Sequence, residues 1–151
     1  MSYFFYILSF FSGLTLTFQL GVNSQLKEKI ENPFIVCLIS IIGSFLTLVM
    51  VIIYKYINGE EILPSITVLK TTEWWMYIGG FLGAFYIIAT ILSASKIGYT
   101  KMFSLVICGQ ILLSTFFDHY GIMSSTITSI SLMKGIGVGL LIISTFIIQI
   151  C

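Results

Sequence analysis

Amide, hydroxyl and carboxyl side chains recur every three or four residues in two otherwise apolar stretches of this sequence. The first series is Ser12, Thr15, Gln19 and Asn23, and the second is Gln110, Ser114 and Asp118. This spacing places each series on one face of an α-helix. Such groups bind a small polar solute in a cavity or form hydrogen bonds to a neighbouring helix. For Gln19 and Gln110 both interpretations, cavity lining and helix packing, remain open.

Asp118 and His119 add charge at the predicted end of the second series. A carboxylate at a helix C-terminus opposes the negative end of the helix dipole, so Asp118 is expected to have a cationic partner, either His119 or a lysine. Two roles are open for this group. It gates one mouth of a cavity and neutralises a cationic solute there, or it forms an ion pair that fixes the following loop.

Other kinds of chemistry lack the residues that they require. The sequence has one histidine, and its three cysteines do not have the spacing of metal ligands. Gly135, Gly137 and Gly139 follow no strand and lie in an apolar stretch, which excludes a phosphate-binding loop. We therefore expect no metal, no cofactor and no enzymatic activity.

The composition indicates an integral membrane protein. Of the 151 residues 58% are hydrophobic and 9% are charged, whereas a soluble domain has roughly 25% charged residues. The net charge of +1, from seven lysines and six acidic residues, argues against a nucleic-acid partner. The lipid bilayer is the expected surrounding.

Five apolar stretches are long enough to cross a bilayer, which takes about 20 residues. They cover residues 3–21, 33–54, 73–93, 99–120 and 132–151. Asn32 followed by Pro33 is typical of a helix start, and Gly121 is typical of a helix end. The expected fold is all-α, with one five-helix membrane domain over residues 1–151. Polar residues 124–131 connect the last two helices.

Small residues at intervals of four mark the third and fifth stretches. The pairs are Gly79 with Gly83, Gly80 with Ala84, and Gly135 with Gly139. Such pairs let helices pack closely, and in the third stretch a flexible point for conformational change is the alternative. Tyr86 continues the face of Gly79 and Gly83 and is a further candidate for cavity lining.

The lysines divide almost evenly between the two sides of the membrane. Lys27, Lys29, Lys96 and Lys101 lie on one side, and Lys55, Lys70 and Lys134 lie on the other. Because orientation follows the lysine and arginine bias, so small a difference predicts insertion in both orientations. The alternative is that local context selects one of them.

The order of several short motifs resembles that of a known family. The motifs are Gln19-x-Gly21-x-Asn23-x-x-Leu26, Pro33 before Gly43, Trp75-x-x-x-Gly79-Gly80-x-x-Gly83-Ala84, Gly98, Gly109-Gln110 and Asp118-His119-Tyr120-Gly121. Over nearly the whole chain the sequence resembles the YdcZ-like family of small bacterial inner-membrane proteins, in the drug/metabolite transporter superfamily with EamA-type carriers. The resemblance implies a multi-pass protein of the bacterial inner membrane, similar to half of a ten-helix transporter with inverted repeats.

These observations together predict a transporter of small polar or amphipathic molecules that works by alternating access. Its partner would be an inverted second copy, in an antiparallel homodimer, or an oppositely oriented paralogue, and inverted repeats suit such a mechanism. The residues expected to line its cavity are Gln19, Asn23, Tyr86, Gln110 and Ser114. The alternative is a non-transporting subunit or regulator that docks another membrane protein. It predicts a single orientation and no solute flux.

Overall fold

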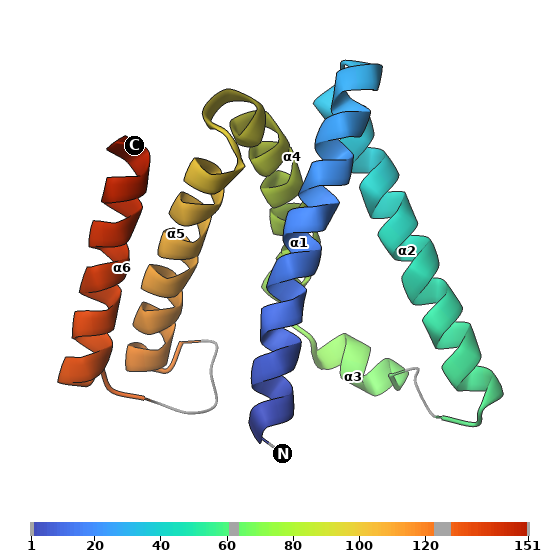
Figure 1. Ribbon diagram of the computed structural model, residues 1–151. Coiled ribbons are helices and arrows are strands. Elements are labelled where there is room, and N and C mark those ends of the chain that lie inside the picture. The colour runs from blue at the N-terminus through green and yellow to red at the C-terminus, as the bar shows by residue number, and fades with distance from the viewer. Residues whose placement is uncertain (1, 61–63, 123–127, 151) are drawn as a thin grey trace. The chain divides into compact units, whose positions relative to one another are not determined.

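The structure, a computed structural model, describes residues 2–60, 64–122 and 128–150. This part of the chain is mainly helical and contains no strand (Figure 1). Five helical segments are long and apolar enough to cross a membrane: Tyr3–Ile30, Pro33–Ile57, Trp74–Ile97, Tyr99–Tyr120 and Leu132–Ile150. The predicted all-α membrane fold with five spans is confirmed. Cys151 and residues 124–127 of the predicted connector lie outside the described residues.

The helices divide between two compact units, Met1–Leu92 and Ser93–Cys151, and the boundary falls within α4. The elements in chain order are α1 (Ser2–Ile30), α2 (Pro33–Ile57), α3 (Ile66–Thr71), the 3-10 helix η1 (Trp74–Ile78), α4 (Gly79–Ile97), α5 (Tyr99–Tyr120) and α6 (Leu132–Ile150). Each unit contains one pair of packed helices. The pairs are α1 with α2 and α5 with α6.

In the first unit, α1 and α2 meet at a short junction (Figure 1). Asn32 caps α2 as its sequence predicts, because its side-chain oxygen accepts hydrogen bonds from the backbone N–H groups of Phe34 (3.0 Å) and Ile35 (3.3 Å). Helix α1 continues to Ile30, past the expected end of the span at residue 21. The lysines in its last turn, Lys27 and Lys29, favour this extension because they face the negative end of the helix dipole.

The third span begins with a tighter helical turn than the sequence indicates. Glu73 has extended backbone geometry, and its carboxylate accepts a hydrogen bond from the indole N–H of Trp75. The chain then forms the 3-10 helix η1 and becomes α-helical at Gly79. The short helix α3 precedes this turn and was not predicted from the sequence. Its N-terminus is capped by the Ser65 hydroxyl, which accepts a hydrogen bond from the backbone N–H of Val68.

In the second unit, a single residue separates α4 from α5. The expected spans 73–93 and 99–120 leave residues 94–98 as their connection, but α4 continues to Ile97 and Gly98 alone makes the turn. Its dihedral angles, φ 82° and ψ 163°, lie in a region that is essentially restricted to glycine. Helices α5 and α6 then run side by side and antiparallel (Figure 1). Gly121 ends α5 in the left-handed conformation, as predicted.

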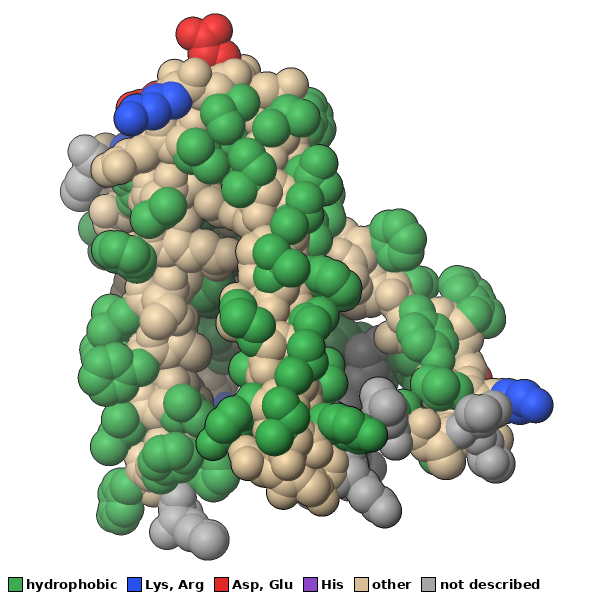
Figure 2. All heavy atoms as spheres, turned by 90° about the vertical axis from the view of Figure 1, so that its right-hand side faces the viewer, with side chains coloured by type: hydrophobic (Ala, Val, Ile, Leu, Met, Phe, Trp, Pro, Cys, Tyr) green, Lys and Arg blue, Asp and Glu red, His purple; other side chains and the backbone are tan. Residues whose placement is uncertain are grey.

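Hydrophobic side chains cover the lengths of the helices, and charged side chains lie at their ends, on the face that Figure 2 shows. Large residues such as Phe18 and Phe81 expose more than three quarters of their surface. Few apolar side chains are buried among the described residues: Leu20, Val36, Cys37, Ile91, Ala94 and Met102. A surface of this kind requires an apolar solvent, which the hydrocarbon core of a bilayer provides.

Candidate functional site

A buried hydrogen bond joins α1 to α2. Asn23, a predicted site residue, is 6% exposed, and its Oδ1 accepts a hydrogen bond of 2.6 Å from the hydroxyl of Ser40. The next residue, Ser24, is also buried, and its hydroxyl has no hydrogen-bond partner in the described part of the chain. Sequence spacing identified Asn23 but not Ser40. The bond commits the acceptor oxygen of Asn23 to helix packing.

Gln19 lies one turn before Asn23 on α1 and is half-buried. Its amide forms no side-chain hydrogen bond within the described residues, in contrast to the amide of Asn23. Tyr86 on α4 is also half-buried, and its carbonyl accepts a hydrogen bond of 2.9 Å from the hydroxyl of the buried Thr90. The first unit therefore contains one candidate amide that is already bonded and one that is available.

The small residues of the predicted packing pairs, on α4 and α6, lie in two different surroundings. The thiol of Cys37 donates a hydrogen bond of 3.7 Å to the carbonyl of Ala84, which places this part of α4 against α2. The glycines of the predicted packing pairs, on α4 and α6, have open space beside them instead. No neighbouring atom lies within 4 Å of the position that an added Cβ would take at Gly79, Gly80, Gly83, Gly135 or Gly139. Close packing at these glycines therefore stays a prediction.

In the second unit, Gln110 and Ser114 lie on the exposed face of α5. The hydroxyl of Ser114 donates to the carbonyl of Ile111 on its own helix, at 3.0 Å. Gln110 lies at the centre of α5, and its amide forms no hydrogen bond with any described residue. Neither α5 nor α6 supplies a partner for this amide.

Asp118 and His119 connect the end of α5 to the segment before α6. Lys134 is the cation beside Asp118, at 3.8 Å between Nζ and Oδ2, and both side chains are nearly half-exposed. The carbonyl of Asp118 accepts a hydrogen bond from the N–H of Thr128 (2.9 Å), and His119 Nδ1 accepts one from the N–H of Ile130 (3.4 Å). This geometry matches the interpretation in which the pair fixes the loop, and gating stays a prediction.

A polar cluster that the sequence analysis missed joins the other ends of α5 and α6. Lys101 Nζ donates to the carbonyl of Gln149 at 3.0 Å, and Gln149 Nε2 donates to the carbonyl of Lys101 and to the hydroxyl of Ser104, each at 3.0 Å. Thr145 adds a bond of 3.4 Å to the carbonyl of Ser104. The spacing of Lys101 from Ser104, and that of Thr145 from Gln149, places each pair on one face of a helix. This spacing was the sequence signal that could have identified the cluster.

The structure therefore brings the predicted site residues together only in part. Gln19, Asn23 and Tyr86 belong to one unit, and Gln110, Ser114, Asp118 and His119 belong to the other. A cavity shared by Gln19 and Gln110 stays a prediction. Within residues 2–60, 64–122 and 128–150, no three His, Cys, Asp or Glu side chains are placed to hold a metal ion.

Comparison with known proteins identifies the family. The model of a family described as "Putative inner membrane exporter, YdcZ" matches residues 4–147. The chain belongs to the YdcZ family. No match was found among the curated proteins or among the solved structures. The resemblance predicted from the sequence motifs is confirmed.

Membership in the YdcZ family agrees with the five apolar helices and their exposed hydrophobic surface. The chain is a multi-pass protein of the inner membrane. The description of the YdcZ family supports a general function in transport across that membrane.

Proposed function

We propose that this YdcZ-family chain pairs with an inverted second copy to form a transporter of small polar or amphipathic molecules. The pair works by alternating access. Gln19 and Gln110 bind the solute through their amides, and Tyr86 contributes an aromatic wall to the cavity.

The observation that carries the proposal is the unpaired amide of Gln110 at the centre of a membrane span. A polar side chain at this depth is costly in hydrocarbon, so it faces protein or a water-filled cavity. The described residues of its own unit offer it no partner, so we infer that the amide is covered by groups that the structure does not place beside it. In the proposed transporter, a second copy of the chain or a cavity enclosed by two copies provides this cover.

Orientation provides the first test, since an antiparallel homodimer requires both orientations in one membrane. Glu28 lies in the last turn of α1, shortly before α2 begins, and Asn58 follows the last residue of α2; both are exposed. In a chain whose native cysteines are replaced, Glu28→Cys and Asn58→Cys are prepared separately and treated in intact cells with a membrane-impermeant thiol reagent. About half of each variant should be labelled. Full labelling of one variant and none of the other contradicts the homodimer and favours the docking subunit.

The solute-binding role of the amides needs a separate test. The variants Gln19→Ala and Gln110→Ala should insert and dimerise normally. Unlike the unaltered protein, they should no longer protect an efflux-deficient bacterial host against a panel of amphipathic compounds. Thr115→Ala is the matched control on α5, because its hydroxyl bonds to the carbonyl of Ile111 on the same helix (2.7 Å). If the glutamine variants fail to insert or assemble, these residues are packing elements and the site assignment is wrong.

A further inference from the structure

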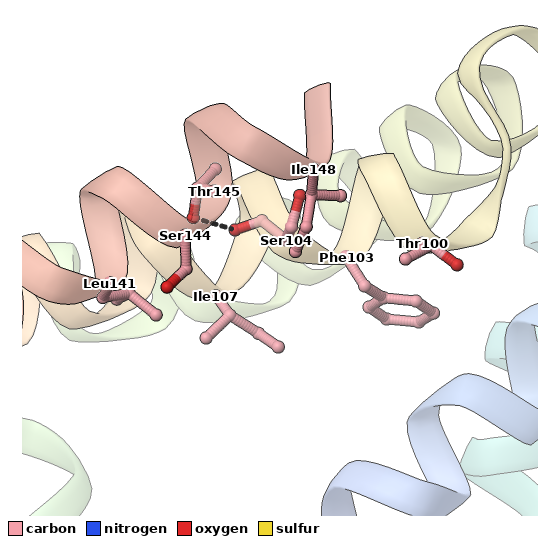
Figure 3. A pocket seen from close by; sticks show the side chains of 8 residues that line it. All are labelled: Thr100, Phe103, Ser104, Ile107, Leu141, Ser144, Thr145 and Ile148. Carbon is pink, nitrogen blue, oxygen red and sulfur yellow. Dashed lines mark hydrogen bonds between the residues drawn. The ribbon is translucent and has the colours of Figure 1, made fainter. Parts of the chain in front are cut away.

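A groove runs between α5 and α6 beside the polar cluster, and neither Gln19 nor Gln110 lines it. Its volume is about 310 Å³. Its lining residues are Thr100, Phe103, Ser104 and Ile107 from α5 together with Leu141, Ser144, Thr145 and Ile148 from α6. Figure 3 shows Phe103, Ile107 and Leu141 on one side of the helix pair. The groove extends from the first turn of α5 for about 10 Å along the helix axis.

The groove is apolar although half of its lining residues carry a hydroxyl group. Ser104 donates to the carbonyl of Lys101 (2.8 Å), Ser144 to that of Leu140 (2.8 Å) and Thr145 to that of Ser104 (3.4 Å). Three of the four hydroxyl donors are therefore occupied by backbone carbonyls, and an occupant meets mainly methyl, methylene and aromatic carbon. This surface suits a hydrocarbon chain and offers little to a polar solute.

Positive charge collects at the end of the unit where the groove begins. Lys96 lies in the last turn of α4 and is exposed, and Lys101 lies in the first turn of α5. One ammonium proton of Lys101 is donated to Gln149, and the described residues offer no acceptor for the other two. The described carboxylate of this unit, Asp118, is about 25 Å away along α5.

We propose that this groove binds an anionic phospholipid of the surrounding bilayer. One acyl chain lies along Phe103, Ile107 and Leu141, and the phosphate lies at the membrane surface beside Lys96 and Lys101. Basic positions between membrane helices favour anionic headgroups, and the apolar groove below them favours the chain. This site is independent of the solute site proposed above.

Native mass spectrometry of the full-length purified protein in detergent tests the proposal. Phosphatidylglycerol and phosphatidylcholine with the same acyl chains are added in equal amounts. The protein should retain more phosphatidylglycerol, and Lys96→Gln should weaken its binding about fivefold, as expected for one lysine near a headgroup. Lys70→Gln, which removes an exposed lysine from α3, is the control and should change nothing.

A second pair of variants tests the groove itself. Ile107→Trp fills it and should lower lipid retention, whereas Ile143→Trp, at a position on α6 outside the groove, should not. Equal retention of the two lipids, or equal losses in Lys96→Gln and Lys70→Gln, overturns the proposal. It is also overturned if Ile107→Trp alters the oligomeric state and leaves lipid retention unchanged, because a second copy then occupies the groove. Should Ile107→Trp fail to fold, the lysine comparison still decides.

Discussion

The hydrogen bond between Asn23 and Ser40 yields a quantitative prediction about how α1 and α2 are held together. Hydrogen bonds between membrane helices contribute about 0.6 kcal/mol on average and at most roughly 1.7 kcal/mol. The bond is 2.6 Å long, and Asn23 is 6% exposed, so we expect a coupling of about 1 kcal/mol. That is about a fivefold change in the folding equilibrium constant. Asn23→Ala should cost more than Ser40→Ala because it also removes buried atoms.

A double-mutant cycle measures this coupling directly. Asn23→Ala, Ser40→Ala and the double variant are unfolded with sodium dodecyl sulfate in mixed micelles, and the transition is followed by the fluorescence of Trp74 and Trp75. The control partner is Ser44→Ala on the same helix, because its hydroxyl donates to the carbonyl of Ser40 at 3.0 Å and does not reach α1. A coupling near zero for Asn23 with Ser40, or an equal coupling for Asn23 with Ser44, refutes this account of the helix pair.

Three further predictions concern the second unit. Gln149→Leu removes two interhelical hydrogen bonds and should lower the free energy of unfolding by about 1 kcal/mol in the same titration. Gly98→Ala should cost about 1–3 kcal/mol, because alanine is strained at φ 82° and ψ 163°, and Gly109→Ala within α5 is its unstrained control. Lys134→Gln should cost less than about 1 kcal/mol, since the pair with Asp118 is exposed; a larger loss would assign the pair a greater role.

The spans could be predicted from sequence because membrane insertion depends on local properties. An apolar run of sufficient length forms a helix wherever it lies, since its backbone groups find no other partners in hydrocarbon. The cap at Asn32 and the glycine end at Gly121 are equally local, and both predictions hold. Helix length was less predictable. Hydropathy marks where a span leaves the membrane, whereas α1 continues as a helix to Ile30.

The polar contacts were harder to predict because each joins residues distant in sequence. The spacing of Asn23 shows its face on α1 but not that Ser40 lies opposite. Gln149 and Lys101 are separated by 48 positions, and their pairing depends on how α5 and α6 align. The one-residue turn at Gly98 was missed for a different reason. The apolar spans 73–93 and 99–120 left residues 94–98 as a short connection, but α4 remains helical to Ile97.

Amide side chains differ in their hydrogen bonding in this chain, and we propose that their roles differ accordingly. The amides of Asn23 and Gln149 are bonded within the helix pairs, and their loss should lower stability. The amides of Gln19 and Gln110 have no such bonds among the described residues, and their loss should lower transport while stability stays nearly unchanged. Stability and transport measured on all four alanine variants separate the two groups. If both properties fall together in every variant, the unpaired amides also serve packing.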